Sequence, residues 1–195
     1  MVLKRIAKSS ETEAITSLIE QGDFGAALSR AASELSEDIG QFCMALLGDQ
    51  ALAEEATVRT LSDFYAAMPA MTNPRPRPWL FETAYRACKQ LRASAAISHQ
   101  ESDSSTDGSA DAASENAPAL IRTLLSSMKP EERETSLLRY LARLGYADIA
   151  NICDLSEESV RKHVSKALLR IRSTVQDDAS SMDEIESEPS SGGQE

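Results

Sequence analysis

The residues with the clearest chemical potential are basic side chains spaced along the segment from 159 to 172. Lysine and arginine at such spacing bind phosphate groups, and arginine also hydrogen-bonds to the edges of bases. At about 100° per residue, Lys162 and Lys166 point away from the apolar side of a helix, with Arg161 and Arg170 on its flanks. The candidate nucleic-acid contacts are Ser159, Arg161, Lys162, His163, Lys166 and Arg170.

Two short helices would position these side chains. An apolar stripe at helical spacing consists of Val160, Val164, Ala167, Leu168 and Ile171. Ser156 is a suitable N-cap for this helix, and Glu157 and Glu158 favour its first turn electrostatically. Another apolar-periodic segment precedes a break at 153–156, which predicts a helix-turn-helix whose second helix enters a major groove. The alternative is a solvated basic surface on an ordinary helix pair.

The charge distribution separates this region from the rest of the chain. The protein of 195 residues has 20 basic and 31 acidic residues, a net charge of −11. Two segments, 98–119 and 177–195, contain only acids among their charged residues, whereas residues 120–176 contain 10 bases and 7 acids. Both acidic segments are poor in large apolar residues, so we expect them to be disordered. They could serve solubility, or their acids could compete with DNA for the basic helix.

Composition argues against several other classes of protein. Cys43, Cys88 and Cys153 stand singly among apolar neighbours, which suits reduced core thiols and a cytoplasmic protein. His99 and His163 share no ligand spacing with cysteines or acids, so we expect neither a metal nor a cofactor. Phosphate-loop, GxSxG and HExxH motifs are missing, and we expect no catalytic residues and no enzymatic activity. No apolar run is long enough for membrane insertion, and no apolar signal core follows the first ten residues.

Helical periodicity along the chain predicts an all-α fold with two small helical domains. We expect helices over 11–20, 24–47, 50–67, 79–95, 118–128 and 131–143, followed by the helix-turn-helix. Pro130 with two following glutamates suits a helix start. The predicted organisation is an N-terminal extension (1–23), a helical domain (24–96), a disordered acidic linker (97–117), a helix-turn-helix domain (118–176) and a disordered acidic tail (177–195).

The C-terminal motifs resemble region four of the extracytoplasmic-function sigma factors of bacterial RNA polymerase. That region resembles L-x-Y-x-E-I-A-x-x-L-x-x-S-x-x-T-V-K followed by R-A-x-x-x-L-R. This chain has Leu144-Gly145-Tyr146-Ala147-Asp148-Ile149-Ala150, then Leu155-Ser156-Glu157-Glu158-Ser159-Val160-Arg161, then Lys166-Ala167-Leu168-Leu169-Arg170-Ile171-Arg172. The resemblance implies that this second helix reads the −35 promoter element.

The N-terminal domain resembles region two of the same family less closely. Gly48-Asp49 and Ala53-Glu54-Glu55 stand where the family has G-D-x-x-x-A-E-D-x-x-Q, with Val58 in place of the glutamine. The resemblance implies contact with core RNA polymerase through Glu54, Glu55 and Arg59. Pro78-Trp79-Leu80-Phe81 resembles the start of the helix that contacts the −10 element, although little of the I-A-R-N and D-x-L-R pattern follows. The corresponding −10 candidates are Arg75, Arg77, Trp79, Arg86 and Lys89.

The expected partners are therefore core RNA polymerase, promoter DNA and an anti-sigma protein. Two alternatives remain open at the level of sequence. Ser159-Val160-Arg161-Lys162-His163 also resembles the T-V-K-x-H of response-regulator output domains, which would make the chain a helix-turn-helix regulator of another type. The divergent −10 segment and the acidic linker and tail suit a sigma-like decoy that only binds an anti-sigma protein or polymerase.

Overall fold

The computed structural model describes residues 12–101 and 127–185, and all regular structure within them is helical. A short helix over 12–20 comes first. It is followed by α2 (Phe24–Leu47), α3 (Gln50–Ala67), the 3-10 turn η1 (Met68–Ala70), α4 (Pro76–Glu101), α6 (Pro130–Tyr140), α7 (Tyr146–Cys153) and α8 (Glu157–Ile185). The predicted all-α class is confirmed.

Side-chain caps set the helix boundaries in the N-terminal domain. Asp23 accepts a hydrogen bond from the Ala26 amide at 3.1 Å and thereby starts α2. Asp49 does the same for α3 through the Leu52 amide, at 2.8 Å. Between them, Gly48 ends α2 in the left-handed conformation with φ of 70°, which costs glycine no steric strain. Each cap satisfies an amide or carbonyl that the helix itself leaves unpaired.

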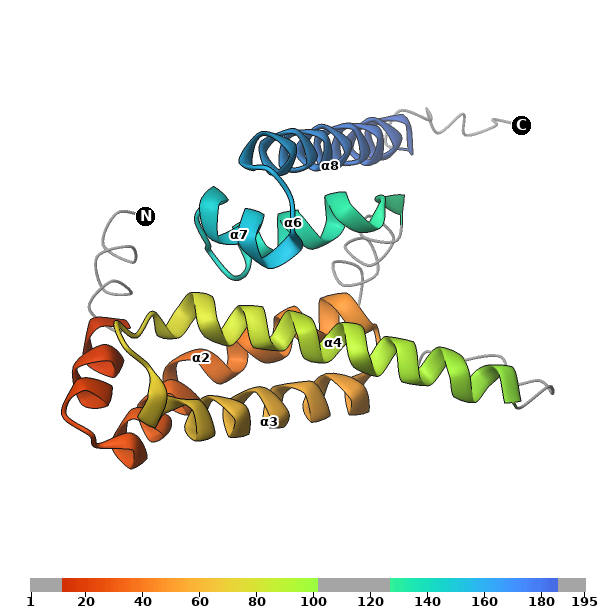
Figure 1. The fold of residues 1–195 in the computed structure, drawn as a ribbon. Coiled ribbons are helices and arrows are strands. Elements are labelled where there is room, and N and C mark those ends of the chain that lie inside the picture. Colours follow the sequence, from red (N-terminus) through yellow and green to blue (C-terminus); the bar gives the residue numbers. More distant parts are fainter. Residues whose placement is uncertain (1–11, 102–126, 186–195) are drawn as a thin grey trace, which may run out of the picture.

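Helices α2, α3 and α4 pack as one antiparallel layer around aromatic residues (Figure 1). Phe42 of α2 meets Phe81 of α4 edge to face, with ring centroids 5.4 Å apart. Phe64 of α3 packs against Trp79 of α4 at the same centroid distance. Offset and edge-to-face pairs of this kind add to the hydrophobic gain of burying the rings. The aromatic contacts therefore hold α4 firmly in the N-terminal layer.

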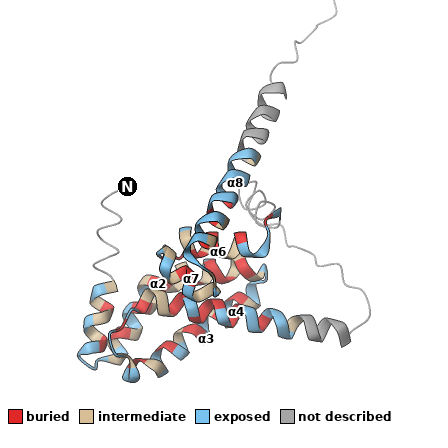
Figure 2. Cartoon of the chain, turned by 45° about the horizontal axis from the view of Figure 1, so that its top comes forward, coloured by how far each residue is buried: buried red, intermediate tan, exposed pale blue. Residues whose placement is uncertain are grey.

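Helices α6, α7 and α8 form a second layer that lies against α4 (Figure 1). Their shared core contains Leu138, Ile149, Val160 and Val164, all at most 1% exposed. Buried residues of both layers belong to one continuous apolar cluster, and Figure 2 shows buried residues in both layers. The two predicted domains are consequently packed together rather than separate in this arrangement.

Several helices differ in length from the predicted ones. Helix α4 continues to Glu101, and α8 continues to Ile185 across the predicted start of the acidic tail, whereas α6 already ends at Tyr140. Extending an existing helix requires no new nucleus, so residues 96–101 and 177–185, which contain no glycine or proline, prolong the two helices. Most of the predicted helix 118–128 and of the linker lies outside the described residues. No helix among the described residues is long and apolar enough to span a membrane.

Candidate nucleic-acid interface

Helices α7 and α8 form a helix-turn-helix at the predicted position. Helix α7 ends at Cys153, and Asp154 adopts the left-handed conformation with φ of 55°. The Leu155 amide then donates to the Ala150 carbonyl at 2.9 Å, which closes the turn. Ser156 caps α8 by accepting a hydrogen bond from the Ser159 amide at 3.1 Å. The turn is thus fixed by local hydrogen bonds that set the direction of α8.

The apolar side of α8 faces α6 and α7 as the spacing predicted, except that Leu168 is exposed and Ile171 is only half-buried. Val160, Val164 and Ala167 are fully or almost fully buried. Leu168, which the periodicity placed in the same stripe, is 45% exposed and lies at its edge. Burial of the first three residues leaves the opposite side of α8 open to solvent.

Lys162 and Lys166 lie on that open side, one helical turn apart. Both are exposed, and neither makes an ion pair with any residue that the structure describes. Leu169, 64% exposed, continues the same side by another turn, and the exposed Arg172 lies near it. Two ammonium groups on one face of a helix, without an ion pair among the described residues, can bind phosphates without first breaking such a pair.

Ser159 and His163 are less available for contact. The Ser159 hydroxyl is 2.9 Å from the Ser156 hydroxyl, so it takes part in the helix cap. The His163 side chain is only partly exposed, and its Nδ1 is buried without a hydrogen-bond partner. Neither side chain is directed wholly towards solvent.

Arg161 is held by its own domain. Its guanidinium lies 4.2 Å from the centre of the Tyr146 ring and 3.4 Å from the Glu157 carboxylate. The Arg139 guanidinium also contacts the Tyr146 ring, at 4.6 Å, and donates to the Leu144 carbonyl at 2.8 Å. Tyr146, the first residue of α7, therefore connects α6 to α8 through two cation–π contacts.

Arg170 is likewise tied to another helix. It forms an ion pair with Glu132 of α6 at 3.2 Å and donates to the Ser127 carbonyl at 3.3 Å. The Glu132 side chain is only 4% exposed. A buried carboxylate requires a counter-charge, so Arg170 supports the packing of α6 against α8.

The predicted −10 residues at the start of α4 are also engaged. Arg75 contacts both carboxylate oxygens of Asp148 in α7, at 2.8 and 3.0 Å. Arg77 pairs with Asp38 at 2.8 Å and donates to the Ala142 carbonyl at 2.7 Å. Trp79 is half-buried against Phe64. None of these three side chains is free in this arrangement.

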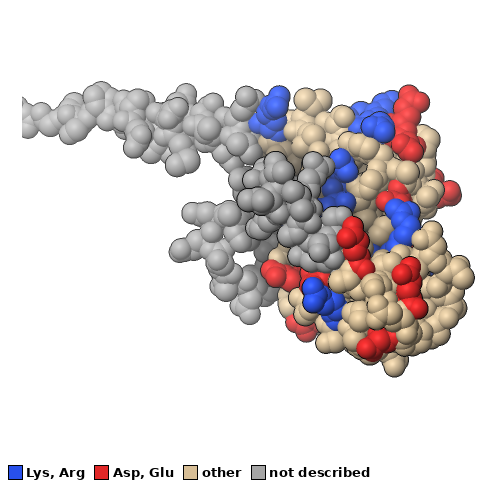
Figure 3. Space-filling model, turned by 90° about the vertical axis from the view of Figure 1, so that its left-hand side faces the viewer, with Lys and Arg blue, Asp and Glu red and all other residues tan. Residues whose placement is uncertain are grey.

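Further along α4, Arg86 and Lys89 remain exposed. Arg86 pairs with Glu82 of the same helix at 2.7 Å, and the Lys89 ammonium lies 5.3 Å from the Tyr85 ring centre. Figure 3, which views the molecule from its N-terminal side, shows basic and acidic side chains next to one another. On that face, basic and acidic side chains are interspersed and do not form one basic surface.

The predicted polymerase contacts share the outer side of α3. Glu54, Glu55 and Arg59 are all exposed, and Glu54 accepts a hydrogen bond from Gln50 at 2.6 Å. Val58, which occupies the position of the family's glutamine, is 65% exposed between them. Single exposed apolar residues are common on protein surfaces, so the exposure of Val58 does not by itself identify a contact surface.

Two residues at the helix-turn-helix were not among the candidates from sequence. These are Arg139 and Tyr146, which hold Arg161 in place. The tyrosine was present in the family pattern, but no local spacing rule links it to Arg161 fifteen residues later. In the part of the chain that the structure describes, no group of histidine, cysteine and acidic side chains could hold a metal ion.

The architecture defines the class of protein as an all-helical, helix-turn-helix protein with two packed domains. Residues 119–171 match the family model for Sigma-70, region 4. That family consists of transcription factors rather than enzymes. No curated protein sequence matches the chain.

Among the solved structures that match, two share the fold of most of this chain. One is CnrH in complex with the cytosolic domain of CnrY, with 12% identity and a TM-score of 0.63, covering 86% of this chain and 99% of that one. The other is the sigma factor RpoE in complex with the anti-sigma factor NepR from Bartonella quintana. It has 19% identity and a TM-score of 0.63, and covers 76% of this chain and 96% of that one. The predicted resemblance to extracytoplasmic-function sigma factors is confirmed.

Proposed function

We propose that the chain is a sigma factor that binds core RNA polymerase and directs promoter recognition, with α8 contacting the −35 element. The observation that carries this proposal is the exposed, unpaired pair Lys162 and Lys166 on the outer side of α8. They lie within a segment that matches Sigma-70, region 4. Such a protein acts in the cytoplasm, where the polymerase is.

Within this proposal, the six candidate residues of α8 have different roles. Lys162 and Lys166 contact DNA directly, because nothing in the described structure competes for them. Arg161 contacts DNA while remaining stacked on Tyr146, since 59% of its side chain is exposed. Arg170 orients α8 through Glu132, and Ser159 and His163 support the N-terminal turns of the helix. Arg86 and Lys89 are the first candidates for contact with the −10 element, because both are exposed to solvent on α4.

Docking on core polymerase is assigned to the outer side of α3. Glu54, Glu55 and Arg59 supply charge, and Val58 supplies an apolar contact at the centre. Loss of the family's amide at Val58 replaces a hydrogen bond with apolar burial, which changes the chemistry of the contact but not its position.

An anti-sigma protein is the proposed regulatory partner. CnrH was solved with the cytosolic domain of CnrY, and RpoE with the anti-sigma factor NepR. The shared fold supports a partner of the same kind for this chain. It also favours a sigma factor over a helix-turn-helix regulator of another type, because the likeness covers both helical layers. A decoy that only binds an anti-sigma protein has the same fold and must be separated by activity.

Two successive measurements test the proposal. The full chain should co-elute with core RNA polymerase, and Glu54→Lys with Glu55→Lys should abolish co-elution without loss of helical content, because exposed charges rarely govern folding. A matched control reverses Glu157 and Glu158, which are exposed acids on α8. Retained co-elution of the α3 variant would refute that docking surface.

Promoter activity then separates a sigma factor from a decoy. Core polymerase should transcribe fragmented genomic DNA from discrete start sites only when the chain is added. A decoy would co-elute with polymerase or an anti-sigma protein and yield no start sites. A regulator of another type would bind DNA but not co-elute with the polymerase.

A further inference from the structure

The turn between α6 and α7 holds an arginine in a backbone conformation that arginine rarely adopts. Among the residues that the structure describes, three non-glycine residues have a positive φ: Asn73 at 60°, Arg143 at 57° and Asp154 at 55°. Asparagine and aspartate tolerate this left-handed region, because their short polar side chains can hydrogen-bond to the local backbone. Arginine lacks that compensation, so its Cβ is strained against the following carbonyl oxygen. Glycine adopts the same conformation without strain.

The surrounding turn fixes Arg143 in this conformation from both sides. Its neighbours Ala142 and Leu144 are 0% and 3% exposed. The Ala142 amide donates to the Leu137 carbonyl at 3.0 Å, and the Leu144 amide donates to the Leu138 carbonyl at 3.1 Å. These contacts hold the turn whichever residue lies between them, so the fold does not explain why that residue is an arginine. Backbone strain that the fold does not require points to a function of the side chain.

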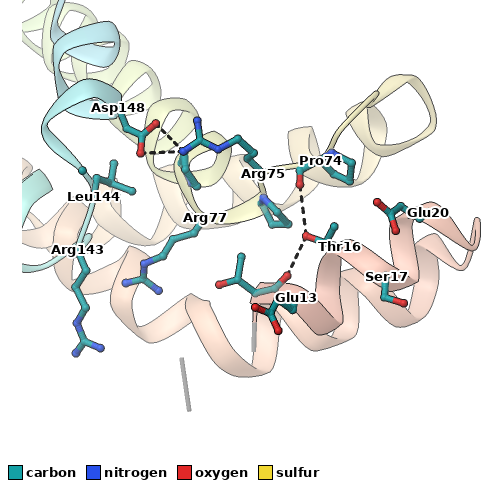
Figure 4. Close-up of a pocket in the computed structure, with 14 residues that line it drawn as sticks. Glu13, Thr16, Ser17, Glu20, Pro74, Arg75, Arg77, Arg143, Leu144 and Asp148 are labelled. Carbon is teal, nitrogen blue, oxygen red and sulfur yellow. Dashed lines mark hydrogen bonds and ion pairs between the residues drawn. The ribbon is translucent and has the colours of Figure 1, made fainter. Parts of the chain in front are cut away.

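The Arg143 side chain is available to an external partner. It is exposed, and it makes no ion pair with any residue that the structure describes. It lines the pocket drawn in Figure 4 together with Arg75 and Asp148, which pair with each other at 2.8 Å. Figure 4 shows the Arg143 guanidinium directed away from that pair. The acid of the pair is therefore engaged by Arg75 and leaves the charge of Arg143 uncompensated.

The turn that carries Arg143 adjoins the start of α8. Tyr146 begins α7 three residues after Arg143, at most about 10 Å further along the chain. The Tyr146 ring centre lies 4.2 Å from the guanidinium of Arg161, near the start of α8. This is the helix that carries Lys162 and Lys166. In helix-turn-helix proteins, the second helix lies in the major groove and the first crosses the DNA backbone, so the segment that leads into the first helix lies beside phosphates.

We propose that Arg143 binds a phosphate of double-stranded DNA beside the groove that α8 enters. This inference deepens the proposed function and rests on it. Lys162 and Lys166 contact the duplex from α8, and Arg143 adds a contact from the turn before α7. Phosphate contacts fix the orientation of a protein on the duplex and carry no sequence information themselves. Arg143 therefore helps to set the position of α8 on the DNA.

The first experiment measures DNA binding by the full chain, with a DNA duplex of mixed sequence as the probe. Arg143→Gly should bind the duplex more weakly. The slope of log K against log salt concentration should fall by about 0.9, the value for one lost phosphate contact. Arg143→Lys keeps a positive charge at the same position, so it should retain most of that slope.

Thermal unfolding of the same variants separates a DNA contact from a structural role. Arg143→Gly should unfold at the same temperature as the unmodified chain or at a higher one, because glycine adopts the left-handed conformation without strain. An arginine that only supports the turn predicts the opposite pattern, a lower unfolding temperature with an unchanged salt slope. That pattern would overturn the proposal.

Two controls keep failure of the inference distinct from failure of the proposed function. Lys129→Ala removes one exposed positive charge from the same layer, just before α6. Equal losses of slope in Lys129→Ala and Arg143→Gly would show a general charge effect and refute the specific contact. Lys162→Ala with Lys166→Ala tests the surface of α8 itself. If this double variant lowers the slope and Arg143→Gly does not, Arg143 does not bind DNA and the proposed function stands. If the unmodified chain does not bind the duplex, both fail.

Co-elution with core RNA polymerase distinguishes DNA from a protein as the partner of Arg143. Arg143→Gly should co-elute with the polymerase as well as the unmodified chain does, because the proposed docking surface lies on α3. Weaker co-elution of this variant, together with an unchanged salt slope for the duplex, would assign Arg143 to the polymerase and overturn the phosphate contact.

Discussion

The most informative substitution is Lys162→Ala combined with Lys166→Ala on the outer side of α8. Both side chains are exposed and unpaired within the described structure, so their removal breaks no internal contact. Exposed substitutions of this kind change the free energy of unfolding by at most about 0.5 kcal/mol. Any loss of DNA binding therefore reports on the interface and not on the fold.

The magnitude follows from the nature of the lost contacts. Each lysine that neutralises a phosphate contributes about 0.9 to the slope of log K against log salt concentration. If both lysines contact phosphates, the slope should fall by about 1.8 and binding should weaken uniformly across sequences. If one of them contacts a base instead, about 1–3 kcal/mol of discrimination should be lost at that position of the site.

The assay is fluorescence anisotropy of promoter DNA with the polymerase holoenzyme, titrated at several salt concentrations. Lys129→Ala is the matched control, because Lys129 is an exposed lysine of the same domain that precedes α6 and lies outside α8. An unchanged affinity and slope in the double variant, or an equal effect of the control, would refute the assignment of this side of α8.

Two further substitutions remove contacts that hold α8 and Arg161 in position. Arg170→Ala should lower the free energy of unfolding by about 1–3 kcal/mol, because it leaves the buried Glu132 carboxylate without its ion pair. Urea denaturation measures this loss. A loss no greater than that of Arg172→Ala would contradict the prediction. Tyr146→Leu should weaken DNA binding and stability by about 1 kcal/mol through loss of two cation–π contacts, whereas Tyr146→Phe should retain both. Equal behaviour of the leucine and phenylalanine variants would exclude the ring as the cause.

Local signals in the sequence predicted the helix-turn-helix closely. Ser156 was expected to cap α8 and does so through the Ser159 amide. Val160 and Val164 were expected on one buried side and are buried. Each of these features depends on residues within one or two helical turns, where spacing alone determines which side chains meet.

Helix ends were predicted less well where acidic composition was taken as the signal. The tail was expected to begin at residue 177, yet α8 reaches Ile185. The serines and acids there disfavour a new helix but do not stop an existing one, and the next strong helix breaker is Pro189. Low hydrophobicity predicts the lack of a packed core more reliably than it predicts the end of a helix.

The sequence did not predict which basic side chains form ion pairs within the protein and which remain unpaired. Arg75 and Arg170 were assigned to DNA because they are arginines on the expected helices or next to them. Their partners Asp148 and Glu132 lie 73 and 38 positions away along the chain, so only the tertiary structure brings them together. A basic residue in a family motif can therefore bind DNA, hold the helix that does, or close the molecule against itself.

Residues with these three roles lie on different parts of the molecule. The exposure of each basic side chain and of its acidic partner explains why the roles differ. Lys162 and Lys166 lie on the side of α8 opposite its buried stripe, and no carboxylate of the described residues forms an ion pair with them. Arg170 reaches across to α6, and its partner Glu132 is buried, so exchanging that partner for a phosphate would leave a carboxylate unpaired inside the protein. The Arg75 side chain is 62% exposed, but its partner Asp148 is only 17% exposed, so water screens that pair mainly from the side of the arginine. The low exposure of both acidic partners thus favours Arg75 and Arg170 as contacts between helices, and leaves Lys162 and Lys166 as the stronger candidates for contact with DNA.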